Sequence, residues 1–517
     1  MPDIVGQDTL CSLWDDLAMH YGKKTFLVFQ DEAGAVVSYT YQEFHDEIIK
    51  TANLFLLLGV EKGERVALQM HTSPEFLMCL FGLTRIGAIV VPLNDHYVEE
   101  ECKSVLRACS ATCVVAEPRY QQHFINMQSE GWSFPRGVLV ARAQTLIEGA
   151  LDFEALKNAQ ASAQEREVTL FPQDVAEVIF TSGTTSLPKG VTLTHANFIF
   201  SGIYGAWQTV MTEHDRMLTT MPACHSNFQF AALTPVLCAH ATLIVVEKYS
   251  ATRFWRQIIE YKATLTQCVA MMLRTLLCQP AAPEERSHCL RDILYFLPVS
   301  TEEKEAFENR FNVQLMNTYG STESLTWVIT DPPHGPRNWP SVGRVGLSYE
   351  VKTIDDQGSE TKPGELGEFI IKGTPGVSLM KEYFNDPQAT GNAISKDGWL
   401  HTGDKGYVDE AGWFYFVDRK TNIIKRGGKN ISAAEIESVL ASHDAVCEAA
   451  VIGIEDPIWD QAIKAFVVLV QEMSVSEEEL LRHCACHLAA YKVPETIEFK
   501  ESLPRTSSMK IEKKNLN

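Results

Sequence analysis

The stretch EVIFTSGTTSLPKGVTLTH, residues 177–195, decides how this chain is interpreted. It begins as a buried type of β-strand, continues as a loop rich in glycine, serine and threonine, and ends as a second β-rich run. Glycines allow a backbone to approach an anion closely, while hydroxyl groups and Lys189 supply donors and charge. The stretch therefore predicts a phosphate-binding loop between two strands, with an ordinary serine- and threonine-rich turn as the alternative.

This loop differs from the phosphate loop of the P-loop nucleotidases. Their loop ends in Gly-Lys followed by Ser or Thr, and that hydroxyl binds magnesium. Here Lys189 follows Pro188 and precedes Gly190. A magnesium ligand therefore has to come from another part of the chain.

The composition indicates a globular protein of at least two domains. The chain has 517 residues, 45% of them hydrophobic, and a formal net charge of −21. Such an acidic excess argues against binding to nucleic acid or to an anionic membrane. The first residues lack the pattern of a signal peptide, no apolar run has the length of a membrane span, and the 13 cysteines show no paired spacing. We expect a cytoplasmic protein with reduced thiols.

Apolar, β-branched runs alternate with helical patterns over roughly residues 60–300. Helical periodicity is evident in residues 73–87 and 250–262. Buried strands are predicted at residues 65–70, 88–93, 112–117, 242–247, 264–269 and 292–297. The alternation is typical of an α/β fold with doubly wound, largely parallel sheets.

The pattern changes after residue 340, where glycine-rich turns recur at short intervals. We expect a small β-rich subdomain over about residues 340–417, within an N-terminal domain of residues 1–417. An α+β pattern follows, with helices around residues 432–442 and His483. A C-terminal domain is therefore predicted over residues 418–517, joined through a hinge near 418–421.

Four further segments carry polar side chains suited to a nucleotide. In NTYGSTES, residues 317–324, Tyr319 suits stacking on a base, Thr322 suits donation to a phosphate, and Glu323 suits magnesium. In HTGDKG, residues 401–406, Asp404 suits both hydroxyls of a ribose. The remaining two segments are DRKTNIIKRGGKNIS, residues 418–432, and PRTSSMKIEKK, residues 504–514. Each segment taken alone is weak evidence of a site.

The stretch LRHCACHLAAY places His483 and His487 one helical turn apart, a spacing that suits a metal. The surrounding residues read as an amphipathic helix in which Cys484 is a core residue. We favour the helix without a metal.

Together and in this order, TSGTTSLPKG, YGSTE, GELGE, HTGD, DRKTNIIKRGGKNIS and PRTSSMK resemble the signature of the adenylate-forming enzymes. That superfamily includes acyl-CoA synthetases, luciferases and peptide adenylation domains. The resemblance extends over essentially the whole chain and is closest to the bacterial crotonobetaine/carnitine–CoA ligases. It implies ATP, Mg2+ and coenzyme A as cofactors and a small carboxylic acid as substrate. The acid is first converted to an acyl-adenylate and then to a CoA thioester.

The resemblance also implies a role for individual residues. The loop from Thr181 to Lys189 would cover the β- and γ-phosphates, Glu323 would bind magnesium, and Lys510 would reach the site from a mobile C-terminal domain. His225 would lie beside the acid and Lys425 would come over the site for the second step. Thr322 would contact the α-phosphate and, with Lys510, Glu323, His225 and Lys425, belong to the catalytic set. The nucleotide and CoA set is Thr181, Ser182, Gly183, Thr184, Thr185, Lys189, Asn317, Tyr319, Asp404, Arg419, Gly427 and Gly428.

Several positions depart from the superfamily pattern, among them Ser186, Thr421, Met509 and the segment 297–300. A protein that binds nucleotide without catalysis, and an enzyme that feeds a separate carrier protein, are therefore alternatives. Another short- or medium-chain acid is the alternative to a betaine. A homodimer and partners in a carnitine pathway also stay open. A trimethylammonium group favours an aromatic cage, for which the candidates are Tyr204, Trp207, Phe228 and Trp327.

Overall fold

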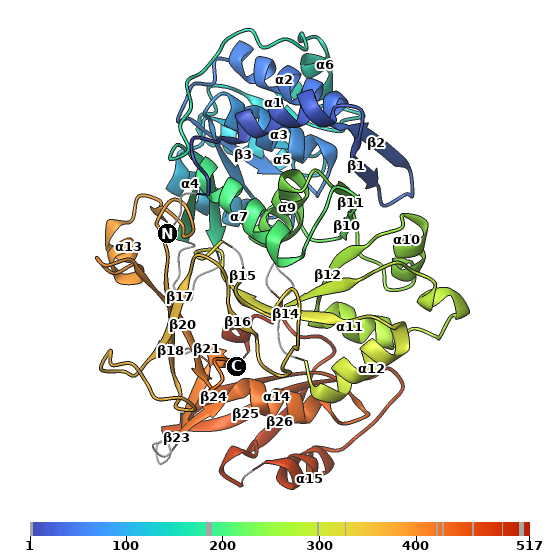
Figure 1. Ribbon diagram of the computed structural model, residues 1–517, viewed down its shortest axis with the longest axis vertical. Helices are drawn as coiled ribbons and strands as arrows, with labels where there is room; N and C mark the ends of the chain where they lie inside the picture. Colours follow the sequence, from blue (N-terminus) through green and yellow to red (C-terminus); the bar gives the residue numbers. More distant parts are fainter. Residues whose placement is uncertain are drawn as a thin grey trace.

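The computed structural model contains four β-sheets flanked by helices (Figure 1). It describes residues 4–181, 189–296, 299–325, 327–419, 422–426, 429–456, 460–488, 490–505 and 511–516. Within these residues, no helix has the length and apolar character required to cross a bilayer.

The largest sheet has nine strands in the order β16-β15-β14-β13-β12-β10-β11-β1-β2. Its centre, from β14 to β1, is parallel, and antiparallel strands lie at both edges. The strands are β1 (Thr25–Gln30), β2 (Val36–Thr40), β10 (Arg216–Thr219), β11 (Thr242–Val246), β12 (Leu265–Val269), β13 (Asp292–Phe296), β14 (Leu315–Gly320), β15 (Trp327–Thr330) and β16 (Arg344–Val345).

A second sheet has eight strands in the order β19-β9-β8-β4-β3-β5-β6-β7. The run from β8 to β7 is parallel, whereas β9 and β19 are antiparallel additions. The strands are β3 (Arg65–Gln69), β4 (Ile89–Pro92), β5 (Cys113–Ala116), β6 (Val138–Val140), β7 (Leu151–Asp152), β8 (Val175–Thr181), β9 (Lys189–Thr194) and β19 (Glu382–Tyr383).

Two smaller sheets follow. An antiparallel sheet of four strands contains β17 (Glu350–Ile354), β18 (Gly367–Lys372), β20 (Trp399–Val408) and β21 (Phe414–Arg419). The C-terminal sheet contains β22 (Ile423–Arg426), β23 (Lys429–Ser432), β24 (Val446–Asp456), β25 (Asp460–Leu469) and β26 (Thr496–Phe499).

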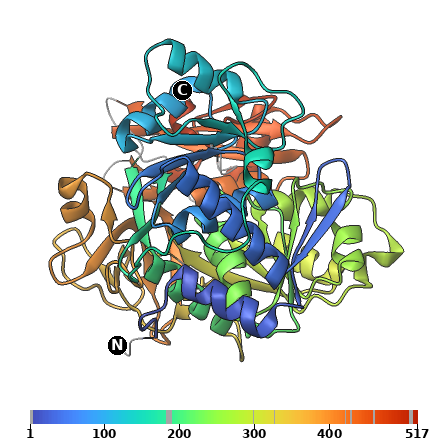
Figure 2. The ribbon, with the colours of Figure 1, turned by 90° about the horizontal axis from the view of Figure 1, so that it is seen from above.

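The helices lie between and around these sheets (Figure 2). They are α1 (Leu10–Tyr21), α2 (Tyr41–Leu57), α3 (Pro74–Arg85), α4 (Glu99–Cys109), α5 (Gln121–Ser129), α6 (Phe153–Asn158), α7 (His195–Gln208), α8 (Ser226–Phe228), α9 (Thr234–Cys238), α10 (Phe254–Glu260), α11 (Ala270–Leu277), α12 (Thr301–Phe311), α13 (Pro387–Ala393), α14 (Ala433–Ala441) and α15 (Glu477–His487).

Local sequence explains where many of these elements begin. In α3, Ser73 is the N-cap and accepts a hydrogen bond from the Phe76 amide, while Pro74 occupies the first helical position, where no donor is lost. Trp14 of α1 then packs its ring 5.0 Å from Phe26 and 5.1 Å from Phe81. These contacts join α1, β1 and α3 in one core, which holds the two large sheets together.

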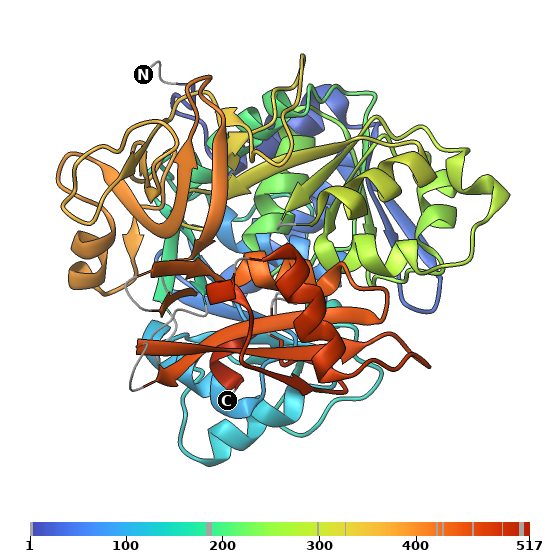
Figure 3. The same ribbon diagram turned by 90° about the horizontal axis from the view of Figure 1, so that it is seen from below.

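The C-terminal unit has a core of its own. Its two buried clusters contain described residues from Ile424 onward, whereas the clusters of the other sheets end at Phe416. Figure 3 shows this unit, in orange and red, lying across the other sheets. The predicted α/β fold class with a separate C-terminal domain is confirmed, and all six predicted strands are present.

Candidate active site

The predicted phosphate loop leaves the eight-stranded sheet at β8 and returns to it at β9. Thr181 and Lys189 are register partners in the antiparallel ladder, and the Thr181 hydroxyl donates to the Lys189 carbonyl oxygen over 3.4 Å. The two ends of the loop therefore lie side by side. Ser182, Gly183, Thr184 and Thr185 fall in the segment 182–188, outside the described residues.

A turn after β14 presents Thr322 and Glu323. The Leu325 amide donates to the Thr322 carbonyl oxygen over 3.2 Å, and the Thr322 hydroxyl lies 3.1 Å from the Ser226 hydroxyl of α8. The Tyr383 hydroxyl donates to Glu323 Oε1 over 3.0 Å. Thr322 and Glu323 are thus held by elements far away in the sequence.

Lys189 and Glu323 both contact the side chain of Tyr383. The Lys189 ammonium lies 5.0 Å from the centre of the Tyr383 ring, and the Tyr383 hydroxyl contacts the Glu323 carboxylate. The structure thus brings the predicted phosphate-binding lysine and the predicted magnesium ligand to one place.

The donors around Glu323 suit a magnesium ion. The turn presents the Glu323 carboxylate, and the hydroxyl of the adjacent Thr322 contacts that of Ser226. Magnesium is typically bound through one or two carboxylates, with water and substrate phosphates completing its shell. The residues therefore fit the ion that the sequence predicts.

Tyr319 and Asp404 form the predicted nucleoside-binding pair. The Tyr319 hydroxyl donates to Asp404 Oδ2 over 2.7 Å, and both residues are buried. In the ladder of the four-stranded sheet, Asp404 is paired with Arg419, whose side chain is outside the described part of the structure. The pair joins the nine-stranded sheet to the β-rich unit.

Asn317 is bonded within the protein. Its side-chain amide donates to the Ser341 carbonyl oxygen over 2.8 Å, and its Oδ1 accepts from the Thr318 amide over 3.0 Å. Its backbone amide donates to Asp331 Oδ2 over 2.8 Å. In this arrangement Asn317 ties the middle of β14 to the segment at Ser341.

His225 lies at the start of α8, which continues into a π-helix at Gln229–Leu233. Asn94 contacts both His225 Nε2, over 3.3 Å, and Cys224 Sγ, over 3.5 Å. Burial raises the pKa of the Cys224 thiol well above its ordinary value, which disfavours a thiolate nucleophile. π-Helical turns are frequent at functional sites.

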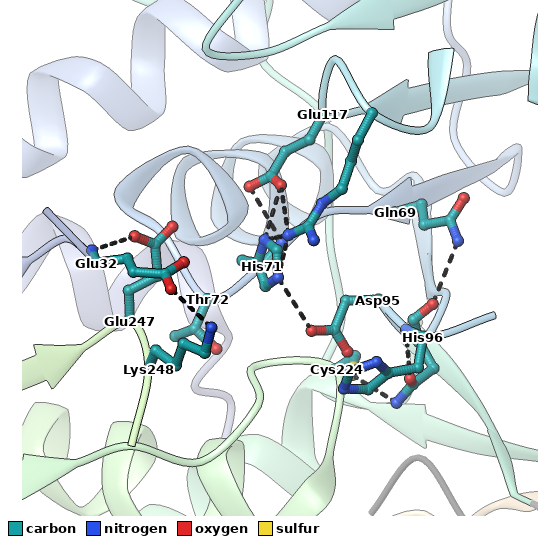
Figure 4. Close-up of polar contacts among 12 residues, drawn as sticks. Glu32, Gln69, His71, Thr72, Asp95, His96, Glu117, Cys224, Glu247 and Lys248 are labelled. Carbon is teal, nitrogen blue, oxygen red and sulfur yellow. Dashed lines mark hydrogen bonds and ion pairs between the residues drawn. The ribbon is translucent and has the colours of Figure 1, made fainter. Parts of the chain in front are cut away.

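A polar network lies at the carboxyl ends of strands from both large sheets. His71 contacts Glu117 over 2.8 Å and Asp95 over 3.5 Å (Figure 4). In the described part of the chain, His71, Glu117 and Glu247 form one group whose potential metal-binding atoms lie within 4.8 Å of one another. Arg142 contacts both glutamates, over 3.2 and 2.5 Å. The Arg142 guanidinium thus supplies the positive charge that a metal ion would otherwise provide to these carboxylates. We therefore assign the group as an ion-pair network.

Two of the four aromatic candidates contact each other: the Tyr204 and Trp207 rings lie 5.5 Å apart in a T-shaped arrangement. The Tyr204 hydroxyl donates to the Trp327 carbonyl oxygen over 2.7 Å, and Phe228 is buried in the core. Trp207, by contrast, lines a surface groove of about 440 Å³ together with Pro332 and Trp413. The role of these aromatic side chains in binding the acid stays a prediction.

The remaining candidates belong to the C-terminal part. The backbone of Lys425 lies in β22, while its side chain, Gly427, Gly428 and Lys510 are outside the described residues. In α15, His483 Nε2 lies 3.0 Å from the Val439 carbonyl oxygen and 3.0 Å from the Ser442 hydroxyl. The predicted helix is confirmed, and His483 contacts α14.

Sequence reasoning missed Tyr383, Ser226 and Asn94. Tyr383 is a strand aromatic in KEYFNDP, a pattern with no chemical signature. Only the pairing of β19 with β9 brings it to Lys189.

Together, the fold and this arrangement of lysine, acidic and nucleoside-binding groups define an enzyme that activates a substrate with a nucleotide. The chain belongs to the AMP-binding enzyme family, whose model matches residues 14–384. A second model, for the AMP-binding enzyme C-terminal domain, matches residues 435–510. The resemblance seen in the sequence motifs is confirmed.

Relatives match the chain from end to end. It is 46% identical to a crotonobetaine/carnitine–CoA ligase of Escherichia coli O17:K52:H18 and 44% identical to one of Proteus mirabilis, each over 99% of this chain and 100% of the relative. An o-succinylbenzoate coenzyme A synthetase from Bacillus subtilis, solved with ATP and a magnesium ion, superposes with a TM-score of 0.84 at 28% identity, covering 98% of both chains. An anthranilate CoA ligase, 24% identical, shares the fold with a TM-score of 0.88 over 98% of this chain and 96% of the other.

Proposed function

We propose that this protein is an ATP-dependent, AMP-forming acid–CoA ligase acting on crotonobetaine, carnitine or γ-butyrobetaine. The proposed chemistry rests on one observation: Lys189 and Glu323 both contact Tyr383, so the phosphate-binding lysine and the magnesium ligand lie close together. The choice of acid is supported by the full-length similarity to the two ligases named above.

The first step is the attack of the acid carboxylate on the α-phosphate of ATP. Lys189 and the loop from Thr181 hold the departing phosphates, and Thr322 donates to the α-phosphate. Glu323 would hold a magnesium ion, which when bound would supply positive charge to the phosphates. Tyr319 and Asp404 hold the nucleoside, and His225 lies beside the acid.

The second step is the attack of the CoA thiol on the acyl-adenylate, with release of AMP. We assign Lys510 to the first step, and Lys425, Gly427 and Gly428 to the second, as the resemblance implies. One site then excludes water from a reactive adenylate before it admits a thiol.

We place the hinge between these states near residues 418–421, with domains at 1–417 and 418–517 and a β-rich subdomain at about 340–417. Asp418 supports this boundary. Its Oδ2 accepts from the Ala434 amide over 3.2 Å, at the start of α14, and its Oδ1 accepts from Asn422 over 3.2 Å. A residue of β21 thus anchors the first helix of the C-terminal unit.

A cytoplasmic location is proposed because all 13 cysteines are free thiols, which suits a reducing compartment. A homodimer, the commonest closed assembly of soluble enzymes, is to be checked by light scattering. The CoA thioester product would be passed to partner enzymes of a carnitine pathway.

A second candidate is an acyl-CoA synthetase for another short- or medium-chain acid. It stays open because, among the described residues, the ring contact between the four aromatic candidates is that of Tyr204 with Trp207, 5.5 Å apart, whereas Phe228 is part of the core. A quaternary ammonium group is bound best where such aromatic faces converge.

Release of pyrophosphate by the purified protein with ATP, magnesium and CoA tests these functions. The panel is crotonobetaine, carnitine, γ-butyrobetaine, butyrate, crotonate and octanoate. We expect the betaines to give kcat/KM at least about tenfold above butyrate and crotonate, the scale of one desolvated cation–π contact of roughly 1.4 kcal/mol or more. Equal use of the uncharged acids would support the second candidate.

The Lys510→Ala variant serves as the control for catalysis. It should bind ATP yet lose adenylate formation, because the group proposed to bridge carboxylate and α-phosphate is removed. No pyrophosphate release from any acid by the wild-type protein would contradict both candidate functions and favour binding without catalysis.

A further inference from the structure

Tyr383 occupies the short strand β19, which is added to the edge of the eight-stranded sheet. Tyr383 pairs with Val191 and Glu382 pairs with Thr192 in the ladder with β9. The Phe384 amide donates to the Gly190 carbonyl oxygen over 2.7 Å. This pairing places the Tyr383 side chain next to Lys189, about 190 residues earlier in the chain.

The same segment also secures Glu323. The Met380 amide donates to the Glu323 carbonyl oxygen over 2.8 Å, and the Tyr383 hydroxyl donates to Glu323 Oε1 over 3.0 Å. One backbone contact and one side-chain contact thus fix both the main chain and the carboxylate of Glu323.

Tyr383 itself is held rigidly. Its backbone amide donates a hydrogen bond to the Thr390 hydroxyl over 2.9 Å. The residue is 7% exposed. A buried phenol with a fixed backbone presents its hydroxyl and its ring face in constant directions.

Both contacts are suited to a site that binds magnesium and phosphates. A phenol that donates to one carboxylate oxygen orients the group and leaves its negative charge available to a cation. An aromatic face within about 6 Å attracts an ammonium group without neutralising it. Within the described residues, Lys189 forms no ion pair with a carboxylate, so its charge stays available for phosphate.

We propose that Tyr383 is a positioning residue that couples the magnesium ligand Glu323 to the phosphate-binding Lys189. The inference rests on the proposed function. Tyr383 acts through these two residues: it sets the carboxylate for the metal and the ammonium for the departing phosphates. Its effect is therefore confined to the step in which pyrophosphate leaves.

The Tyr383→Phe variant removes the hydroxyl and keeps the ring. We expect the magnesium concentration for half-maximal adenylate formation to rise about tenfold, the low end of the range for lost outer-shell partners of a metal ligand. Saturating magnesium should restore kcat, and KM for the acid should stay unchanged. In Tyr383→Leu, loss of the ring should raise KM for ATP about threefold further.

A binding measurement provides a readout besides turnover. Mn2+ is titrated into the protein with α,β-methylene-ATP, which cannot transfer its adenylyl group because the methylene bridge between the α- and β-phosphates is not cleaved, and free Mn2+ is followed by electron paramagnetic resonance. We expect about tenfold weaker Mn2+ binding for Tyr383→Phe. Thioester formation from preformed acyl-adenylate should proceed at the wild-type rate, because pyrophosphate has already left.

Tyr415→Phe is the matched control. The Tyr415 hydroxyl also contacts a carboxylate, Asp409 Oδ2, over 3.2 Å, but in the β-rich unit. It should leave Mn2+ binding unchanged. Unchanged Mn2+ binding and magnesium dependence in Tyr383→Phe would overturn the inference, as would an equal loss in both half-reactions with a normal melting temperature. Absence of adenylate formation in the wild-type protein would contradict the proposed function instead.

Discussion

Glu177 is a carboxylic acid with no exposed surface in the middle of β8. Its Oε1 accepts a hydrogen bond from the Gln229 side-chain amide over 2.8 Å. Burial raises the pKa of Glu177 from 4.5 to about 8, and this hydrogen bond offsets the rise only in part. The folded protein therefore retains a proton that the unfolded chain releases.

The Glu177→Gln variant should lack the loss of stability that the wild-type protein undergoes when Glu177 is deprotonated at high pH. Because the pKa is higher in the folded state, the free energy of unfolding falls as pH rises from about 4.5 to about 8. The loss is at most about 5 kcal/mol, at 1.36 kcal/mol per pKa unit. The variant should match the wild type near pH 5 and unfold at higher denaturant concentration at pH 8.5, as measured by urea titration.

Glu350→Gln, at an exposed position of β17, is the control and should leave the urea midpoint unchanged at both pH values. Equal midpoints for Glu177→Gln and the wild type at pH 8.5 would show that Glu177 does not retain its proton. The sequence did not predict that Glu177 is buried, because a glutamate in a strand can face either solvent or the core.

The packing of α7 against α9 depends on a glycine. A β-carbon at Gly202 would clash with Cys238 Sγ and lie 2.7 Å from the Thr234 carbonyl oxygen. The α9 helix continues the π-helix that follows α8, so a shift of α9 is transmitted towards His225. Close approach of the two helices thus contributes to the geometry of the site.

The Gly202→Ala variant should lose about 1–3 kcal/mol of stability, the usual cost of overpacking a core. We expect a melting temperature several degrees lower and a raised KM for the acid. Gly391→Ala in α13, where a β-carbon meets nothing within 4 Å, is the control. It should be neutral or slightly stabilising, because alanine favours a helix. A melting temperature of Gly202→Ala equal to that of the control would contradict the prediction.

Elements with strong periodicity were predictable from sequence. The runs that became β3, β4, β5, β11, β12 and β13 are short, apolar and β-branched, and parallel strands buried on both faces have this pattern. The strand β19 was not predicted, because two residues carry no periodicity and the strand exists only through its pairing with β9.

An ion-pair network joins the two large sheets. Arg142 follows β6, Glu117 follows β5, and Glu247 follows β11 of the other sheet. The side chains of Glu117 and Glu247 are 7% and 9% exposed. Burial raises the pKa of Glu117 despite the neighbouring guanidinium. Loss of Arg142 would leave two buried carboxylates without this partner.

The Arg142→Met variant should lower stability by about 3 kcal/mol, near the low end for breaking a buried pair, because Arg142 is itself 30% exposed. Calorimetry should detect the lower melting temperature. Lys248→Met is the control, since Lys248 and Glu32 are 64% and 62% exposed and such pairs contribute under about 1 kcal/mol. Equal effects of the two substitutions would show that the network does not hold the sheets together.

The sequence by itself determined the fold class, the family and the chemical groups of the site. Strand periodicity and motifs such as TSGTTSLPKG and YGSTE depend only on residue type and local spacing, and both can be read directly from the sequence. Tertiary structure alone decided which groups meet: Tyr383 with Lys189 and Glu323, and Arg142 with Glu117 and Glu247. These contacts join residues between 25 and 194 positions apart. No local pattern encodes them, because they arise only when strands from separate parts of the chain pair and pack.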